Sequence, residues 1–255
     1  MSLKALIFDV DGTLAETEEL HRWAFNEVFR KQGLNWEWDQ SLYAELLKVT
    51  GGRERIRHYM QTIDSDLLAQ ENLGEFIAGL HREKTDYYTQ QVDQGKLALR
   101  PGVERLIREA REEGLRLAIA TTTSRPNVVS LLSSTLGTES LDWFEALGTG
   151  ECSPLKKPDP GVYHWVLEQM NLPANECLAL EDSSNGLQAG LAASIPTVIT
   201  VSSYTAKDDF SGALVVANHL GSVEQPAEMY QGDALGKDQI DIALLRHWHE
   251  QGDES

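Results

Sequence analysis

Near its N-terminal end the chain reads Ala5-Leu6-Ile7-Phe8-Asp9-Val10-Asp11-Gly12-Thr13-Leu14. The apolar residues at the start of this stretch predict a buried strand, and two carboxylates follow it two residues apart. Carboxylates at the end of a buried strand lower the stability of the fold, so their presence indicates a catalytic or binding role. Asp9 and Asp11 point to the same side if the strand geometry persists, and Gly12 lets the backbone turn away. The alternative, a strand with a simple Asp-Gly turn, leaves Asp9 unexplained.

Composition places the chain among ordinary globular proteins, with one exception. It has 255 residues, 41% hydrophobic and 24% charged, so it can bury a sizeable core as one large domain or as a domain with an insertion. The exception is the net charge of −18, which repels nucleic acid and anionic membrane surfaces. We therefore expect no nucleic-acid or membrane partner. A phosphate-containing ligand can bind only where a metal or local cations reverse the field.

The cysteines and the apolar runs bear on where the protein works. Cys152 and Cys177 lack metal-ligand spacing and indicate reduced thiols. No apolar run approaches about 18 residues, and no basic segment precedes a long apolar one, so neither a membrane span nor a signal peptide is expected. We expect a cytoplasmic protein, or one of the plastid stroma if a transit peptide has been removed.

After Leu14 the pattern changes from strand to helix. Apolar residues recur at three- and four-residue spacing. This spacing predicts amphipathic helices over 16–33, 42–49, 53–63 and 73–92. Residues 17–95 therefore predict a helical domain inserted into a second domain, which is made of 1–16 and 96–255.

Beyond residue 100, helices and strands alternate. Strands are expected at 115–120, 146–150, 177–180 and 197–201. This alternation predicts an α/β fold, a Rossmann-like parallel sheet with helices on both faces. The C-terminal extension, 206–255, is less informative: 221–236 is expected to be a loop and 240–249 a helix.

Reactive side chains gather where the predicted strands end. They are Asp9 and Asp11, Thr121 and Thr122, Lys157 before a proline, and Glu181 and Asp182. The carboxyl ends of parallel strands lie along one edge of a sheet, so these groups can converge on one site. Acids from two strands suit Mg²⁺, while hydroxyl and ammonium groups suit a phosphate. The pattern predicts phosphoryl transfer.

These segments resemble the four signature motifs of the haloacid dehalogenase (HAD) superfamily, in its phosphatase and phosphomutase branch. The matching motifs are Asp-x-Asp-Gly-Thr-Leu, a Thr after the next buried strand, Lys-Pro-x-Pro and Glu-Asp-Ser-x-x-Gly, in the order of the family. The resemblance covers residues 1–205, helical insertion included. It implies a Rossmann-like core with a helical cap, Mg²⁺ as cofactor, and an aspartyl-phosphate intermediate.

The resemblance also implies roles for the acids. Asp9 is the expected nucleophile, and Asp11 is the expected general acid and then general base. Asp9, the backbone carbonyl of Asp11 and Asp182 are the expected Mg²⁺ ligands. Two interpretations stay open for Glu181: an indirect contact with the metal, or a solvated acid at the strand end.

The phosphate contacts follow from the same motifs. Thr121, with Thr122 beside it, and Lys157 are the residues that the resemblance implies for binding the phosphoryl oxygens. Lys157 also offsets the charge of the acids. Its place directly before Pro158 selects it over Lys156.

The insertion stands at the C1 cap position of the family, and such caps close over the site and select the substrate. Residues 50–55 combine a flexible turn with cations. Arg53, with Gly52 in the turn, is the candidate anchor for a second anionic group. The alternative for Arg53 is an arginine on a solvated helix face.

Three further cap residues, Thr17, His21 and Lys84, resemble positions in β-phosphoglucomutases. The resemblance implies that they control when the acid/base group transfers its proton and that they bind a distal phosphate. The alternatives are a helix N-cap for Thr17 and a surface position for His21.

Within the superfamily, residues 14–21 and the Thr-Gly-Gly-Arg-Glu-Arg-Ile lid resemble the CbbY-like group. This resemblance implies a sugar-phosphate phosphatase, with xylulose 1,5-bisphosphate, an inhibitor of Rubisco, as candidate substrate and xylulose 5-phosphate as product. A cap that must open and shut favours a monomer. Two alternatives stay open. One is a β-phosphoglucomutase-type phosphomutase, and the other is a non-catalytic binding protein with the HAD fold.

Overall fold

A computed structural model describes residues 2–252 of the chain. Its centre is a seven-stranded sheet in the order β3-β2-β1-β4-β5-β6-β7. The strands are β1 (Ala5–Phe8), β2 (Arg116–Ala120), β3 (Phe144–Gly148), β4 (Cys177–Glu181), β5 (Thr197–Thr200), β6 (Val215–Ala217) and β7 (Met229–Gln231). All neighbouring strands run parallel except β6 and β7. The predicted α/β fold with a parallel sheet is confirmed.

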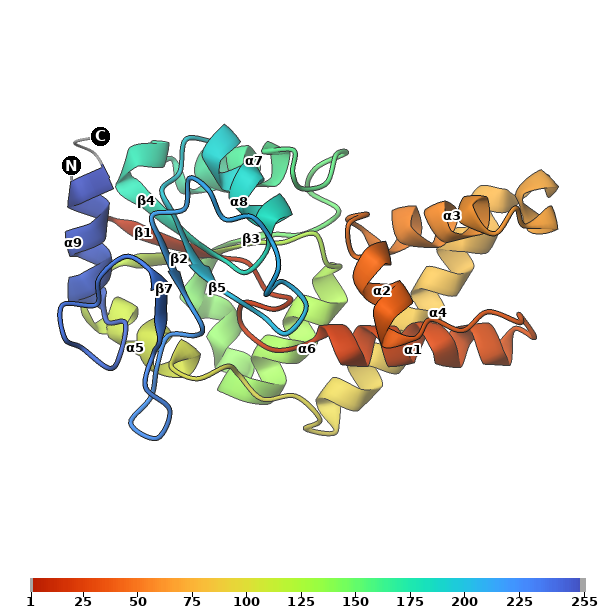
Figure 1. The fold of residues 1–255 in the computed structure, drawn as a ribbon, viewed down its shortest axis with the longest axis horizontal. Helices are drawn as coiled ribbons and strands as arrows, with labels where there is room; N and C mark the ends of the chain where they lie inside the picture. Colours follow the sequence, from red (N-terminus) through yellow and green to blue (C-terminus); the bar gives the residue numbers. More distant parts are fainter. Residues whose placement is uncertain (1, 253–255) are drawn as a thin grey trace.

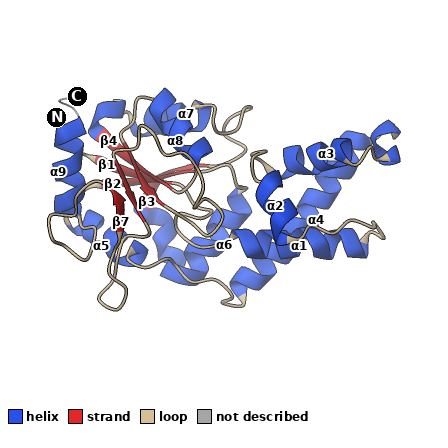
Figure 2. Ribbon diagram, viewed as in Figure 1, coloured by secondary structure: helices blue, strands red, loops and turns tan. Residues whose placement is uncertain are grey.

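Helices cover both faces of the sheet (Figure 1, Figure 2). One face packs against α5 (Val103–Glu112), α6 (Arg125–Leu136) and α9 (Ile242–Gly252), and the other against α7 (Gly161–Met170) and α8 (Ser184–Ala192). Leu6 and Phe8 of β1 belong to the first cluster, Ala5 and Ile7 to the second. A strand covered on both faces needs a continuous apolar run, which is what the sequence shows there. Within residues 2–252 no helix is long and apolar enough to cross a membrane.

Four more helices lie beside the sheet (Figure 1). They are α1 (Glu18–Lys31), α2 (Gln40–Leu46), α3 (Gly52–Thr62) and α4 (Leu73–Asp93). They enclose an aromatic cluster of their own around the fully buried Trp38, whose ring contacts Phe25, Phe29 and Tyr43. The sheet has buried clusters on each of its faces, and the separate cluster among these four helices supports the division into a core and a cap that we propose.

The C-terminal extension differs from the sequence prediction. The segment 221–236, expected to be a loop, contains β7, and β6 is a further strand that the pattern did not indicate. Each strand has three residues, which is too short for alternation to show. β7 also pairs antiparallel at the sheet edge with a register irregularity, so its pairing depends on the neighbouring strand.

Leu131 of α6 is fully buried in the cluster beneath the sheet. Leu131→Ala removes packed methyl groups and leaves a cavity, so we expect the free energy of unfolding in urea to fall by about 2–5 kcal/mol. Leu155 is 60% exposed, and Leu155→Ala should change it by less than about 0.5 kcal/mol. Equal losses in the two variants would contradict this placement of the core.

Candidate active site

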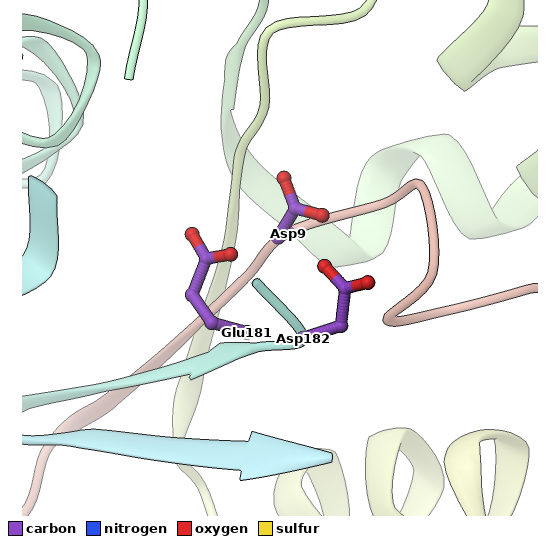
Figure 3. Close-up of side chains that lie close together, drawn as sticks. All are labelled: Asp9, Glu181 and Asp182. Carbon is purple, nitrogen blue, oxygen red and sulfur yellow. The ribbon is translucent and has the colours of Figure 1, made fainter. Parts of the chain in front are cut away.

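The central strands β1 and β4 end side by side and bring three carboxylates together. Asp9 follows β1, and its backbone N–H donates to the Leu180 carbonyl at 2.9 Å. Glu181 is the last residue of β4, and Asp182 follows it. One carboxylate oxygen from each acid lies within 4.8 Å of the others, and all three side chains are buried (Figure 3). The parallel sheet thus brings together residues far apart in the sequence.

Lys157 lies against this acid cluster. Its Nζ donates to Asp9 Oδ1 at 2.7 Å, to Glu181 Oε1 at 2.5 Å and to the Ala120 carbonyl at 2.7 Å. Burial lowers the pKa of the Lys157 ammonium, but Asp9 and Glu181 outweigh that effect, so the pKa lies above its usual value. Lys157 is therefore a permanent cation beside Asp9.

Glu181 is fully buried, so its interpretation as a solvated acid is wrong. The Tyr163 hydroxyl, on α7, donates to the same Glu181 oxygen that binds Lys157. Sequence reasoning missed Tyr163, because its position in the helical pattern indicates a core residue and carries no sign of the polar contact.

One buried ammonium does not balance three carboxylates. Burial raises the pKa of Asp9 to about 8, against the opposing charge of Lys157, and the charge of Glu181 adds to the rise. Burial and the charge of Asp9 raise the pKa of Asp182. Glu181 Oε2 has no hydrogen-bond partner among residues 2–252. A cluster of hard oxygen donors with unbalanced negative charge fits Mg²⁺.

Gly12 lets Asp182 approach the turn that follows the two aspartates. Its φ is +84°, in the left-handed region that favours glycine. A Cβ at this position would lie 2.1 Å from Asp182 Oδ2. Glycine is therefore required for the backbone conformation and for the space that the Asp182 carboxylate occupies.

Asp11 faces the cap, where three residues form a chain of hydrogen bonds. Thr17 Oγ1 donates to Asp11 Oδ1 at 2.7 Å, and His21 Nε2 lies 3.0 Å from the same oxygen. Lys84 Nζ lies 2.6 Å from His21 Nδ1. Burial lowers the pKa of Lys84 to about 8, so it is an ammonium at neutral pH and can only donate. His21 Nδ1 therefore accepts, and Nε2–H donates to Asp11.

This chain of bonds decides the open interpretations of the three cap residues. Thr17 is the N-cap residue of α1, but its side chain makes no capping bond and binds Asp11 instead. His21 is buried, so a surface position is wrong. Burial alone raises the pKa of Asp11, but His21 and Thr17 bind the ionised form and hold the pKa below its usual range. Thr17, His21 and Lys84 thus surround the acid/base candidate.

Asp9, Asp11 and Asp182 line a chamber of about 700 Å³ between the sheet edge and the cap helices. Both threonines expected to bind phosphate, Thr121 and Thr122, line it. Gly52, at the start of α3, lines its cap side, where a Cβ would collide with the His81 ring. The predicted core and cap residues therefore face the same space or, like Thr17 and Glu181, bind a residue that does, with one exception.

The exception is Arg53, which the structure does not bring to the chamber. Arg53 is exposed and lies along a separate surface depression, whereas Arg55 is buried and lines the chamber. Arg55 donates to the Leu46 carbonyl at 3.2 Å and to the Tyr43 hydroxyl at 3.1 Å. Helix α3 begins at Gly52, and residues two apart on a helix point to different sides.

Comparison with known proteins agrees with the fold. A model of the haloacid dehalogenase-like hydrolases matches residues 3–194, and the chain belongs to this family. It is therefore a hydrolase, as the sequence predicts, and the alternative of a non-catalytic protein is not supported.

The relatives include CbbY proteins. The chain is 47% identical over 247 residues to "Protein CbbY, plasmid" of Cupriavidus necator. The aligned residues cover 97% of this chain and 97% of that protein. It is 42% identical to a solved structure of CbbY from Rhodobacter sphaeroides in complex with phosphate, with a TM-score of 0.78 over 85% of this chain and 94% of that one. A mutant of the same CbbY in complex with xylulose-(1,5)bisphosphate is 41% identical, with a TM-score of 0.79 over 87% and 98%.

Gly12→Ala should displace Asp182. We expect Mg²⁺ binding, measured by calorimetry, to weaken by at least about 10-fold. Gly33→Ala is the matched control, because Gly33 also has a positive φ, +67°, but a Cβ there meets nothing within 4 Å. Gly33→Ala should lose about 1–2 kcal/mol of stability from backbone strain and bind Mg²⁺ as the wild type does. Gly12→Ala should lose more stability, because its Cβ also collides with Asp182. Unchanged Mg²⁺ binding in Gly12→Ala would contradict the assigned role of Asp182.

Proposed function

We propose that the protein is a Mg²⁺-dependent sugar-phosphate phosphatase that acts through an aspartyl-phosphate on Asp9. The observation that carries the proposal is the separation of the two acids. Asp9 lies with Lys157 and Asp182 in the core, while Asp11, two residues on, is bound by cap residues. One carboxylate is thus placed for nucleophilic attack and the other for proton transfer.

The metal would be held by Asp9, Asp182 and the backbone carbonyl of Asp11, with Glu181 behind them. When bound, Mg²⁺ reduces the repulsion between an anionic nucleophile and an anionic phosphate. Lys157 orients the Asp9 carboxylate through Oδ1. Thr121 and Thr122 supply hydroxyl groups to the phosphoryl oxygens from the chamber wall.

The reaction has two halves. In the first, an Asp9 oxygen forms a bond to phosphorus, the bond from phosphorus to the sugar oxygen breaks, and Asp11 gives its proton to that oxygen. In the second, water attacks phosphorus, Asp11 takes the proton, and the Asp9–phosphorus bond breaks to release phosphate. The hydrogen bonds from Thr17 and His21 favour ionised Asp11, the form needed in the second half. A bound phosphate dianion raises the pKa of a nearby carboxyl and favours the protonated form needed in the first.

The substrate that we propose is xylulose 1,5-bisphosphate, with xylulose 5-phosphate as product. Two observations support it: the bisphosphate bound by the similar CbbY, and the size and charge of the chamber. About 700 Å³ is in the usual range for a small-molecule site. Lys48 and Arg55 line the chamber from the cap, where a second phosphate needs positive charge in a protein of net charge −18.

Asp9→Asn tests the nucleophile. The amide keeps the shape of the side chain but is a poor nucleophile, so phosphate release should fall by at least about 10³-fold. Asp86→Asn, at an exposed cap position, is the control and should retain wild-type activity. Chelation with EDTA should abolish wild-type activity and added Mg²⁺ should restore it. Undiminished phosphate release by Asp9→Asn, with its fold intact by circular dichroism, would exclude the mechanism.

A second assay separates phosphatase from phosphomutase. We expect phosphate release from a panel of sugar mono- and bisphosphates to be fastest with xylulose 1,5-bisphosphate. In a parallel reaction, the protein is given β-glucose 1-phosphate, a trace of the 1,6-bisphosphate and Mg²⁺. Stoichiometric glucose 6-phosphate without free phosphate would establish the phosphomutase instead.

A further inference from the structure

Arg100 is a buried cation that none of the steps above uses. It ends the second of the two linkers between the cap and the sheet, and its backbone N–H donates to the Leu14 carbonyl of the first linker at 2.8 Å. Ala15 and Leu99 form a β-bridge beside this bond. The Arg100 side chain is 7% exposed, so its charge is stabilised by protein groups.

The guanidinium of Arg100 binds several backbone carbonyls. Nη1 donates to the Gly12 carbonyl and to the Thr200 carbonyl, the latter at 2.8 Å. Nη2 donates to the Val201 carbonyl at 2.6 Å and to the Asn218 carbonyl at 2.7 Å. Nε lies 3.3 Å from a carboxylate oxygen of Glu16. One side chain therefore joins the turn after Asp11 to the end of β5 and to the residue after β6.

Gly12 is held from two sides. Its α-carbon faces the Asp182 carboxylate, since a Cβ there would lie 2.1 Å from Oδ2, and its carbonyl accepts from Arg100. The Gly12 carbonyl lies in the peptide after Gly12, and the Asp11 carbonyl lies in the peptide before it, so the two are coupled through the φ and ψ angles of Gly12. A fixed partner for the Gly12 carbonyl therefore restricts the turn that carries the Asp11 carbonyl and that faces Asp182.

We infer that Arg100 is a positioning residue for the proposed phosphatase reaction, on which this inference rests. It holds the Asp11-Gly12 turn against the end of β5, and this keeps Asp9, the Asp11 carbonyl and Asp182 at the spacing that a divalent cation requires. Arg100 touches neither the substrate nor the metal ligands' carboxylates.

Lysine cannot replace arginine in this role. A guanidinium has five donors fixed in a plane, whereas an ammonium is a compact point charge with three. Arg100→Lys keeps the charge but leaves some of the four carbonyls unpaired, and each unpaired buried acceptor is destabilising. Arg100→Met removes all the donors.

Arg105 of α5 is a matched control. Its guanidinium donates to the Leu220 carbonyl at 3.0 Å, to the Ile240 carbonyl at 2.9 Å and to Glu109 at 3.0 Å. It therefore ties segments of the C-terminal extension together with the same chemistry, but it has no contact with the turn after Asp11. Variants of Arg105 therefore measure how much stability is lost with such hydrogen bonds when the carboxylates of the candidate site are undisturbed.

The experiment compares Arg100→Lys, Arg100→Met, Arg105→Lys and Arg105→Met. Three quantities are measured: the melting temperature, kcat and KM for phosphate release, and Mg²⁺ binding by calorimetry without substrate. We expect both Arg100 variants to lose about 10–100-fold in kcat and about 10-fold in Mg²⁺ affinity, with KM changed much less. The Arg105 variants should lower the melting temperature by less, because the Arg105 side chain is 30% exposed, and keep wild-type kcat and Mg²⁺ affinity.

Each outcome of this experiment either supports or overturns the role of Arg100. If Arg100→Met does not fold, Arg100→Lys decides. Wild-type kcat and Mg²⁺ affinity in Arg100→Lys, or equal losses of both in the Arg100 and Arg105 variants, would overturn the inference. If the wild type releases no phosphate from any sugar phosphate, the proposed function fails, and Mg²⁺ calorimetry still tests Arg100. If the wild type is active and the Arg100 variants match it, only the inference on Arg100 fails.

Discussion

Three buried carboxylates at the ends of two adjacent strands repel one another unless a cation lies among them. Asp9, Glu181 and Asp182 place carboxylate oxygens within 4.8 Å of one another, and only Lys157 among the described residues donates to two of them. The arrangement holds because the acids are fixed to adjacent parallel strands, which themselves lie in a sheet buried on both faces. The remaining negative charge is what makes the site suited to a divalent cation and, through it, to an anionic substrate.

The second acid of the opening motif is controlled by a different part of the molecule. Asp11 takes its hydrogen bonds from Thr17 and His21, and Lys84 of α4 fixes the tautomer of His21. The cap therefore does more than enclose the chamber. Any movement of α1 against the sheet changes the partners of Asp11, so the proposed proton-transfer group depends on the position of the cap, while the proposed nucleophile depends on the core.

Sequence reasoning was most successful where a residue type and a strand end coincide. Asp9, Lys157 and Asp182 were expected at one sheet edge, and the structure brings them together although Lys157 is 148 residues from Asp9. It failed where geometry inside an element decides. The start of α3 at Gly52 turns Arg55 and not Arg53 toward the chamber, and β6 and β7 are too short to show a pattern. The sequence did not indicate roles for Tyr163 and Arg100, because a polar contact with a buried carboxylate or carbonyl produces no periodic pattern of residues.

The fold class and the chemical groups of the candidate site follow from the amino-acid sequence, because buried parallel strands require continuous apolar runs and their carboxyl ends meet at one edge. The surroundings of each group depend on the packing of the folded chain. The two aspartates of the opening motif have opposite pKa shifts since one is packed among acids and the other accepts bonds from the cap. Environments of this kind are assembled from distant segments, and no local pattern records them.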